Sequence, residues 1–149
     1  MIHVERVGHV MLRVRSLERS LAFYQDTLGL REVARRDFGE GLTVFLSTGA
    51  THHDIALVET DAAPARRGRD VGLHHLAFKI GDGPGALSLA KQALESAGTP
   101  ILMALDHRVS QGIYVPDPDG NVIELYVDAS EAPWRADPTL VANSDFLSL

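Results

Sequence analysis

The chain has 149 residues, of which 45% are hydrophobic, and this is enough for one compact domain with its own core. It has no cysteine, which excludes disulfides and thiolate metal sites, so a bound metal would need histidine, aspartate or glutamate ligands. The net charge of -6 argues against a surface that binds nucleic acid. No apolar run approaches the roughly 18 residues of a membrane span, and "MIHVERVGHV" carries charges where a signal peptide would be apolar. We therefore expect a soluble, cytoplasmic protein without membrane contact.

The first half of the chain predicts a strand, a helix and three further strands, in that order. The residues "GHVMLRV" alternate as in a strand, with Met11 and Arg13 on the same face as His9. Between a cap at Ser16 and a stop at Gly29, a helix is predicted from four apolar side chains at helical spacing: Leu17, Leu21, Tyr24 and Leu28. The three strands are predicted near residues 30–38, 42–48 and 53–59.

The second half repeats this order after a linker. Residues 60–72, "TDAAPARRGRDVG", have the proline, glycine and charge content of a linker, and the basic run at 65–69 is interpreted as a solvated part of it. The residues "HHLAFKI" alternate about His75. A helix that ends at Gly98 follows, with four residues on its apolar face: Leu87, Ala90, Leu94 and Ala97. The remaining strands are predicted near residues 100–106, 112–116 and 121–128.

The two halves form an internal repeat that can be aligned by residue. His9 aligns with His75 in the first strands, and Ala56 of "IALVE" aligns with Glu124 of "IELYV" in the last strands. Because equivalent positions of a duplicated fold face the same central space, we expect these four residues to converge, and all but Ala56 can bind a metal. The prediction is one domain over residues 1–149, divided into module one (about 3–60), the linker (about 60–72), module two (about 73–128) and a tail (129–149).

Two segments carry a resemblance to a known superfamily: "GHVMLRVRSLERSLAFYQDTLGL" and "VPDPDGNVIELY". Over about residues 5–128 the chain resembles the vicinal oxygen chelate superfamily, which includes glyoxalase I, fosfomycin-resistance proteins, bleomycin-binding proteins and extradiol catechol dioxygenases. The resemblance implies an α+β fold in which two tandem βαβββ modules form a cupped, eight-stranded mixed sheet around a metal site. It also implies the ligands of that site, which are His9, His75 and Glu124.

The position of Ala56 bears on which member of the superfamily this chain resembles most. Glyoxalase I typically supplies a second glutamate there, as a fourth protein ligand, and Ala56 has no donor atom. Two imidazoles and one carboxylate remain, a set that suits Fe(II) and leaves open positions for a bidentate substrate and O₂. Fosfomycin-resistance enzymes also use two histidines and one glutamate, usually around Mn(II), so Mn(II) is the alternative metal.

Three further residues resemble groups of extradiol dioxygenases outside the metal ligands. His53 in "HDIAL" stands where those enzymes have an acid-base histidine, His107 where they have a second active-site histidine, and Tyr114 where they have an active-site tyrosine. A histidine that titrates near neutrality can take and return a proton, and a tyrosine can donate a hydrogen bond to a charged oxygen. The resemblance therefore implies an extradiol ring-cleaving dioxygenase whose partners are an aromatic diol and O₂.

Two other classes stay open at this point. A metal-dependent isomerase or transferase of the glyoxalase or fosfomycin-resistance type would act on thiol adducts without O₂. A binding protein of the bleomycin-resistance type would need no metal. Such a protein would therefore have no reason to keep His9, His75 and Glu124 together.

Simpler structural roles compete with the functional ones for several residues. Strict alternation puts His53 on the opposite strand face from position 56, so that a bulge or a site at the strand entrance would be needed to bring it inward. His74 and His75 should lie on opposite strand faces, which makes His74 a structural or supporting residue. Arg13 and Lys79, at equivalent repeat positions, are expected to form salt bridges. The apolar residues of the tail suggest packing over the site or onto a second subunit, and we expect a homo-oligomer.

Overall fold

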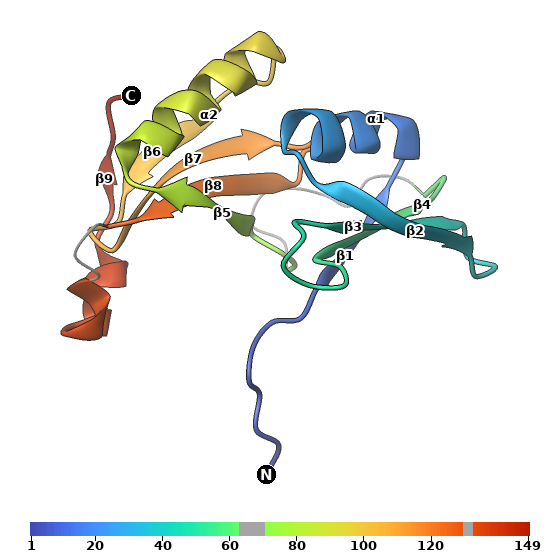
Figure 1. Cartoon of the computed structure of the whole chain (residues 1–149), viewed down its shortest axis with the longest axis horizontal. Helices are drawn as coiled ribbons and strands as arrows, with labels where there is room; N and C mark the ends of the chain where they lie inside the picture. The colour runs from blue at the N-terminus through green and yellow to red at the C-terminus, as the bar shows by residue number, and fades with distance from the viewer. Residues whose placement is uncertain (63–70, 130–132) are drawn as a thin grey trace. The chain divides into compact units, whose positions relative to one another are not determined.

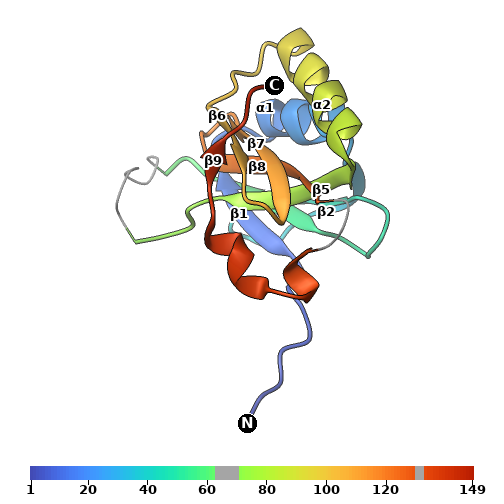
Figure 2. The ribbon, with the colours of Figure 1, turned by 90° about the vertical axis from the view of Figure 1, so that its left-hand side faces the viewer.

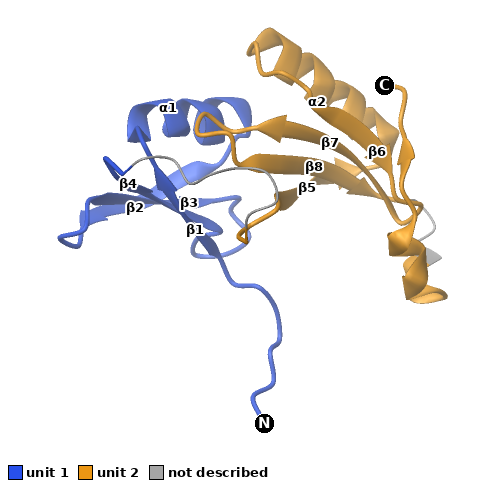
Figure 3. Ribbon diagram, turned by 180° about the vertical axis from the view of Figure 1, so that it is seen from behind, with its two compact units in different colours: residues 1–67 blue, residues 68–149 orange. Residues whose placement is uncertain are grey.

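A computed structural model describes residues 1–62, 71–129 and 133–149 of the protein. The chain divides into two compact units, Met1–Arg67 and Gly68–Leu149 (Figure 3). The basic run predicted to be a solvated linker, residues 65–69, lies outside the described residues.

The first unit contains one four-stranded sheet with a helical segment on one of its faces (Figure 1). Its elements are β1 (Val10–Val14), the helix α1 (Leu17–Leu21), the π-helix η1 (Ala22–Thr27), β2 (Arg31–Asp37), β3 (Leu42–Ser47) and β4 (Ile55–Glu59). The strand order is β1-β4-β3-β2, with β1 parallel to β4 and the other neighbours antiparallel. Each predicted strand of this half is found, with ends shifted by at most two residues.

The predicted helix of the first unit is present, but it widens in its second half. Ser16 caps it as predicted, since its side chain accepts a hydrogen bond from the backbone N–H of Arg19 at 3.3 Å. Beyond Leu21 the hydrogen bonds become those of a π-helix, and the N–H of Leu28 donates to the carbonyl of Phe23 at 3.0 Å. The wider turn changes which residues face inward: Leu17, Ser20, Phe23 and Tyr24 are buried, whereas Leu21 and Leu28 are half-buried.

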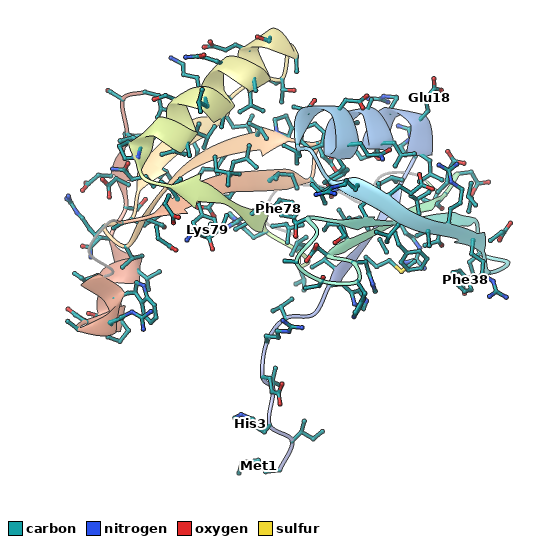
Figure 4. The ribbon with its side chains drawn as sticks, in the orientation of Figure 1. Met1, His3, Glu18, Phe38, Phe78 and Lys79 are labelled. Carbon is teal, nitrogen blue, oxygen red and sulfur yellow. The ribbon has the colours of Figure 1, made fainter. Side chains whose placement is uncertain are left out.

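Burial in the first unit follows the predicted alternation of β1. Leu12 and Val14 are buried, and Met11 and Arg13, which share a face with His9 in the predicted pattern, are exposed. The central strand β4, which lies between β1 and β3, is buried on both faces from Ile55 to Val58. At the turn between β2 and β3, Phe38 is 61% exposed (Figure 4).

The second unit repeats the module and adds one strand from the tail (Figures 1 and 2). Its elements are β5 (Leu76–Asp82), the helix α2 (Pro84–Ser96), β6 (Met103–Asp106), β7 (Ser110–Pro116), β8 (Val122–Asp128), the 3-10 helices η2 (Pro133–Arg135) and η3 (Pro138–Ala142), and β9 (Asp145–Phe146). The strand order is β5-β8-β7-β6-β9, with β5 parallel to β8. The strand β9, at the edge beside β6, was not predicted.

The helix α2 buries the two leucines of its predicted apolar face. Leu87 and Leu94 are each 1% exposed, whereas Ala90 is half-buried and Ala97 is exposed. Pro84 begins the helix, and Gly98, just beyond its end, has a φ of 67° that suits glycine. In β8, Ile123, Leu125 and Val127 alternate with Glu124 and Tyr126, so that Glu124 lies on the sheet face opposite to these three apolar side chains.

The predicted α+β fold with two βαβββ modules is confirmed, as two sheets of four and five strands. No helix within the described ranges is both long enough and apolar enough to cross a membrane.

Candidate metal centre

In the second unit, two of the three predicted ligands lie side by side. His75 immediately precedes β5, and Glu124 lies in the neighbouring parallel strand β8, where it pairs with Ala77. Nε2 of His75 and Oε2 of Glu124 are 3.1 Å apart, and the Glu124 side chain is only 9% exposed. Two donor atoms that each lie about 2.1 Å from one metal ion are separated by about 3 Å, so this pair has the spacing of a metal-binding pair. Without a metal it forms an ion pair when His75 is protonated.

The carboxylate of Glu124 lies against a glycine of the adjacent strand. A Cβ atom added to Gly112 in β7 would be 2.6 Å from Oε1 and 3.1 Å from Cγ of Glu124. Only a residue without a side chain leaves room for this carboxylate in its present position. Gly112 was not among the residues predicted from the sequence, although a single glycine inside a strand pattern often marks such a close approach.

The imidazole of His75 is also in contact with its neighbour in sequence. Both His74 and His75 precede β5, which begins at Leu76, and their Nδ1 atoms are 2.8 Å apart. The expectation that they would lie on opposite strand faces is wrong, because neither is part of the strand. His74 therefore contacts one ring nitrogen of His75, while the other ring nitrogen faces Glu124.

Tyr114 and His107 extend this cluster. Tyr114 lies in β7 directly opposite Glu124, and its ring stands edge-on to that of His75 with centroids 5.5 Å apart. The hydroxyl of Tyr114 is 3.0 Å from Nε2 of His107. Burial, together with a hydrogen bond to Glu124 and its negative charge, raises the pKa of Tyr114 well above its usual value. The phenol therefore stays protonated and is available as a hydrogen-bond donor.

In the first unit, His9 and His53 lie in contact. They precede the parallel neighbours β1 and β4, and the backbone N–H of Val10 donates to the carbonyl of Asp54 at 3.1 Å. The ring centroids of His9 and His53 are 4.3 Å apart. His53 also packs edge-on against Phe45, which pairs with Ala56 across β3 and β4.

These contacts place the ring of His53 beside Phe45, which pairs with Ala56, so strict alternation does not hold for His53. The reason is that β4 begins only at Ile55, so the alternation of the strand does not extend back to residue 53. His53 therefore stands at the strand entrance, one of the two positions that the sequence left open.

The environment of His53 disfavours its protonated form. Partial burial, followed by the nearby His9 and His52, lowers its pKa below the ordinary histidine value, although Asp54 acts in the opposite direction. The Nδ1 atoms of His52 and His53 are 2.6 Å apart. At neutral pH, His53 is therefore a neutral imidazole that can accept a proton.

The turn that carries His53 is held by the carboxylate of Asp54. Oδ2 accepts hydrogen bonds from the backbone N–H of Thr48 at 2.7 Å and from its hydroxyl at 3.0 Å, and Oδ1 accepts one from Thr51 at 3.0 Å. Partial burial raises the pKa of Asp54, but these bonds and one from Ser47 outweigh it, so the pKa is lowered. Asp54 thus stays ionised and fixes the approach to β4.

Arg13 and Lys79, at equivalent repeat positions, form salt bridges as expected. Lys79 pairs with Asp82 at 2.8 Å and with Asp128 at 2.9 Å, and Arg13 pairs with Glu40 at 3.8 Å. The ion pairs of Lys79 raise its pKa. In Figure 4, Phe78 and Lys79 mark neighbouring positions on β5.

The donor set is compatible with a divalent metal. His75 and Glu124 present one imidazole nitrogen and one carboxylate oxygen at 3.1 Å, and the chain contains no thiolate that would select a softer ion. The predicted third ligand, His9, belongs to the first unit. Among the residues that the structure describes, no group of three or more histidine, aspartate or glutamate side chains is gathered in one place.

Two βαβββ units in tandem, each with a histidine just ahead of its first strand, define the class of small α+β domains built by duplication of this module. The chain belongs to the Glyoxalase/Bleomycin resistance protein/Dioxygenase superfamily, whose sequence model matches residues 6–125. The predicted membership is thereby confirmed.

The relatives of the chain include more than one enzyme class. A catechol-2,3-dioxygenase of Bacillus subtilis is 35% identical over 132 residues, which cover 88% of this chain and 44% of the relative. This chain therefore spans less than half the length of that enzyme. A lactoylglutathione lyase of Neisseria meningitidis is 32% identical over 126 residues, 80% of this chain and 88% of the relative. A fosfomycin resistance protein of Listeria monocytogenes, solved with Mn(II) and sulfate, has the same fold, with a TM-score of 0.66 at 20% identity over 87% of this chain and 98% of that one.

Proposed function

We propose that the protein is a metal-dependent extradiol dioxygenase that cleaves the ring of a catechol-type aromatic with O₂. In this proposal His9, His75 and Glu124 hold one Fe(II) ion, with Mn(II) as the alternative. When bound, such an ion neutralises the charge of a deprotonated diol and offers open positions for substrate and O₂.

The observation that carries the proposal is that each unit has proton-handling groups in contact with its metal donors. His53 lies against His9 in the first unit. In the second unit, Tyr114 contacts both His75 and Glu124, and its hydroxyl meets His107. Metal-free binding would have no use for such groups, whereas ring cleavage requires protons to be removed from the diol and later returned.

Each of these groups has a distinct task in the proposed reaction. His53 is neutral at pH 7 because its pKa is lowered, so one of its ring nitrogens can take a proton from a diol hydroxyl and later return it. Tyr114 keeps its proton and can donate a hydrogen bond to the ionised diol oxygen. His107 contacts the hydroxyl of Tyr114 and holds it in place.

A second candidate is a metal-dependent isomerase or transferase of the glyoxalase or fosfomycin-resistance type, which would act on thiol adducts without O₂. The relationship to lactoylglutathione lyase favours it. Ala56 counts against the glyoxalase form, because it is 1% exposed and supplies no fourth ligand at the position that aligns with Glu124. A metal-free binding protein of the bleomycin-resistance type is the third candidate.

The proposal is tested by metal analysis of protein purified without air, followed by assays with a panel of catechols. We expect about one Fe(II) or Mn(II) per chain, and yellow ring-opened products only when O₂ is present. Replacing His9, His75 or Glu124 with alanine should abolish stoichiometric metal, whereas His74→Ala should retain it at saturating metal concentration.

Two outcomes would contradict the proposal. Retention of full metal by His75→Ala would exclude it as a ligand. Turnover of a thiol adduct without O₂, with no activity on any catechol, would favour the second candidate. The proposal also places the reaction in the cytoplasm, in the breakdown of aromatic compounds, and cell fractionation that finds the protein elsewhere would refute that location.

A further inference from the structure

The C-terminal segment, residues 143–149, is attached to the edge of the second sheet by backbone contacts. The strand β9 pairs with β6, with Leu105 opposite Phe146 and Asp106 opposite Asp145, and it runs along this edge in Figure 2. Beyond it, the N–H of Leu147 donates to the carbonyl of Ala104 at 2.9 Å. Phe146 remains 88% exposed, so burial of its side chain does not explain why the segment lies there.

The segment lies beside the turn that carries His107. In this turn, between β6 and β7, the N–H of His107 donates to the carbonyl of Ser110 at 2.8 Å. Arg108 has a φ of 66°, a left-handed conformation that non-glycine residues seldom adopt and that suits a two-residue hairpin turn. Its N–H donates to Asp106 at 2.7 Å, and its guanidinium forms an ion pair with Asp145 of β9. The turn and the segment therefore hold each other in place.

Asn143, at the start of the segment, contacts His107 directly. The backbone carbonyl of Asn143 lies 2.9 Å from Nδ1 of His107. Asn143 is itself held by two hydrogen bonds to the carbonyl of Leu140, one from its backbone N–H at 3.0 Å and one from its side-chain amide at 2.8 Å. A carbonyl can only accept, so this contact requires a proton on Nδ1.

That requirement determines what the other ring nitrogen does. In neutral His107 a proton on Nδ1 leaves Nε2 as an acceptor, and the hydroxyl of Tyr114 lies 3.0 Å from it. Tyr114 has one hydroxyl proton and two possible acceptors, His107 and Glu124. With Nδ1 protonated, the Tyr114 proton can go to His107. With Nε2 protonated, His107 would donate to the Tyr114 oxygen, and the phenol proton would go to Glu124.

We propose that the backbone carbonyl of Asn143 selects between these two arrangements. By keeping neutral His107 protonated on Nδ1, it gives the Tyr114 proton a second acceptor besides Glu124, so that the phenol occupies the Glu124 carboxylate less often and leaves it more available to a cation. The C-terminal segment thus positions His107 and Tyr114. The importance of this for turnover rests on the proposed function, whereas the selection of the tautomer does not.

The test compares two shortened chains with the full chain, one ending at residue 142 and a matched control ending at residue 147. The control keeps β9, the Asn143 carbonyl and the Leu147 contact. The ring ¹⁵N shifts of His107, measured in EDTA at a pH where it is neutral, report which nitrogen carries the proton. We expect Nδ1–H in the full chain and the control, and a population of Nε2–H in the chain ending at 142. An unchanged Nδ1–H tautomer in that shortened chain, with its fold intact, would overturn the proposal.

A full-length variant covers the case in which the shortened chain does not fold. Asp145→Lys places a like charge beside Arg108 and should loosen the segment, again with Nε2–H appearing at His107. If this variant releases β9, as judged by amide exchange, yet keeps pure Nδ1–H, the proposal is wrong.

Binding of Mn(II) alone gives an independent readout. When the Tyr114 proton goes to Glu124, a ligand oxygen is occupied, so the chain ending at 142 should bind Mn(II) about 10-fold more weakly than the control. In a Tyr114→Phe background the two lengths should bind equally, because no phenol proton remains. An equal 10-fold loss in that background would show that the segment acts on stability and not through Tyr114. Neither readout uses a catechol or O₂, so failure of the proposed reaction would not be mistaken for failure of this inference.

Discussion

Four histidines, two in each unit, stand just ahead of strands and not within them. His9 and His53 precede β1 and β4, and His74 and His75 precede β5. A ring at a strand entrance is not restricted to one sheet face by alternation, so it can turn toward a neighbour such as Glu124 or His9. This freedom lets adjacent histidines contact each other while one of each pair faces a second partner.

At the residue scale, His53→Gln tests whether this side chain transfers protons. Because His53 is outside the proposed ligand set, the variant should still bind iron and catechol. Turnover should fall by roughly 10²- to 10⁴-fold, which corresponds to about 3 to 5 kcal/mol on the barrier. The lowered pKa of His53 makes the neutral base prevalent at pH 7, so the loss of wild-type activity at acidic pH, owed to its protonation, should be absent from the variant.

The matched control is His52→Gln, the exposed neighbour in the same turn. Steady-state kinetics across pH should show a near wild-type profile for this control. Wild-type turnover by His53→Gln, or joint loss of its metal and its fold, would assign His53 a structural role.

Gly112→Ala tests the fit of the Glu124 carboxylate. The added methyl group would lie 2.6 Å from Oε1 in the present arrangement, so the carboxylate must move away. We expect about 10-fold weaker Mn(II) or Fe(II) binding by titration, with the circular dichroism of the fold retained. Gly85→Ala is the control, because nothing lies within 4 Å of a Cβ added there. Equal metal affinity in both variants would show that Glu124 tolerates the displacement.

At the scale of elements, the turn between β3 and β4 depends on one carboxylate. Asp54 accepts hydrogen bonds from Thr48, Thr51 and Ser47, and these bonds lower its pKa. A turn built this way holds β4 against β3 and holds His53 beside His9. The corresponding turn of the second unit, between β7 and β8, is also held by a carboxylate, because Asp117 accepts hydrogen bonds from the backbone N–H groups of Asp119 and Asn121 and from the side-chain amide of Asn121.

Asp54→Asn should lower the free energy of unfolding by about 1 to 2 kcal/mol near pH 7, because an amide is a weaker acceptor than a partly exposed carboxylate with several donors. The folded-state pKa lies below the unfolded one, so the stabilisation is present above the unfolded value and is lost as pH falls through the folded value. Urea unfolding should therefore separate wild type and variant at pH 7, and the difference should shrink once the pH falls below the unfolded value of about 4 and on through the folded value. A difference that is the same at both pH values would contradict this role.

At the scale of the whole molecule, several apolar side chains of the tail are uncovered. Trp134 is 43% exposed, Val141 61% and Phe146 88%. The expectation that tail side chains pack over the site or against a second subunit stays a prediction, and β9 shows only that the tail backbone is attached to β6. The N-terminal segment also exposes apolar side chains, with Ile2 at 92%, and Met1 and His3 are marked on it in Figure 4.

We expect a homodimer or larger assembly, because burying these apolar side chains against a second copy would be favourable. Light scattering of the full chain at micromolar concentration should give at least twice the chain mass, and deletion of residues 131–149 should weaken the assembly. A monomer mass for the full chain would refute the prediction.

The sequence by itself determined the module order and the repeat. Alternation about His9 and His75, helical spacing from Leu17 and from Leu87, and glycine stops at Gly29 and Gly98 are local signals, and each predicted element is present. Alignment of the two halves also selected His75 over His74 and paired it with Glu124. That pairing was within reach of the sequence because β5 and β8 occupy repeat positions whose neighbours follow from the topology of the module.

Only the tertiary structure decided which side chains and backbone groups come into contact. Gly112 against Glu124, His53 against Phe45, and the Asn143 carbonyl on His107, which is 36 residues away in the chain, leave no periodic signal. The physical reason is that period and propensity describe how a segment folds on itself. The contact between the Asn143 carbonyl and Nδ1 of His107 depends instead on how the whole fold positions a turn and a distant part of the backbone.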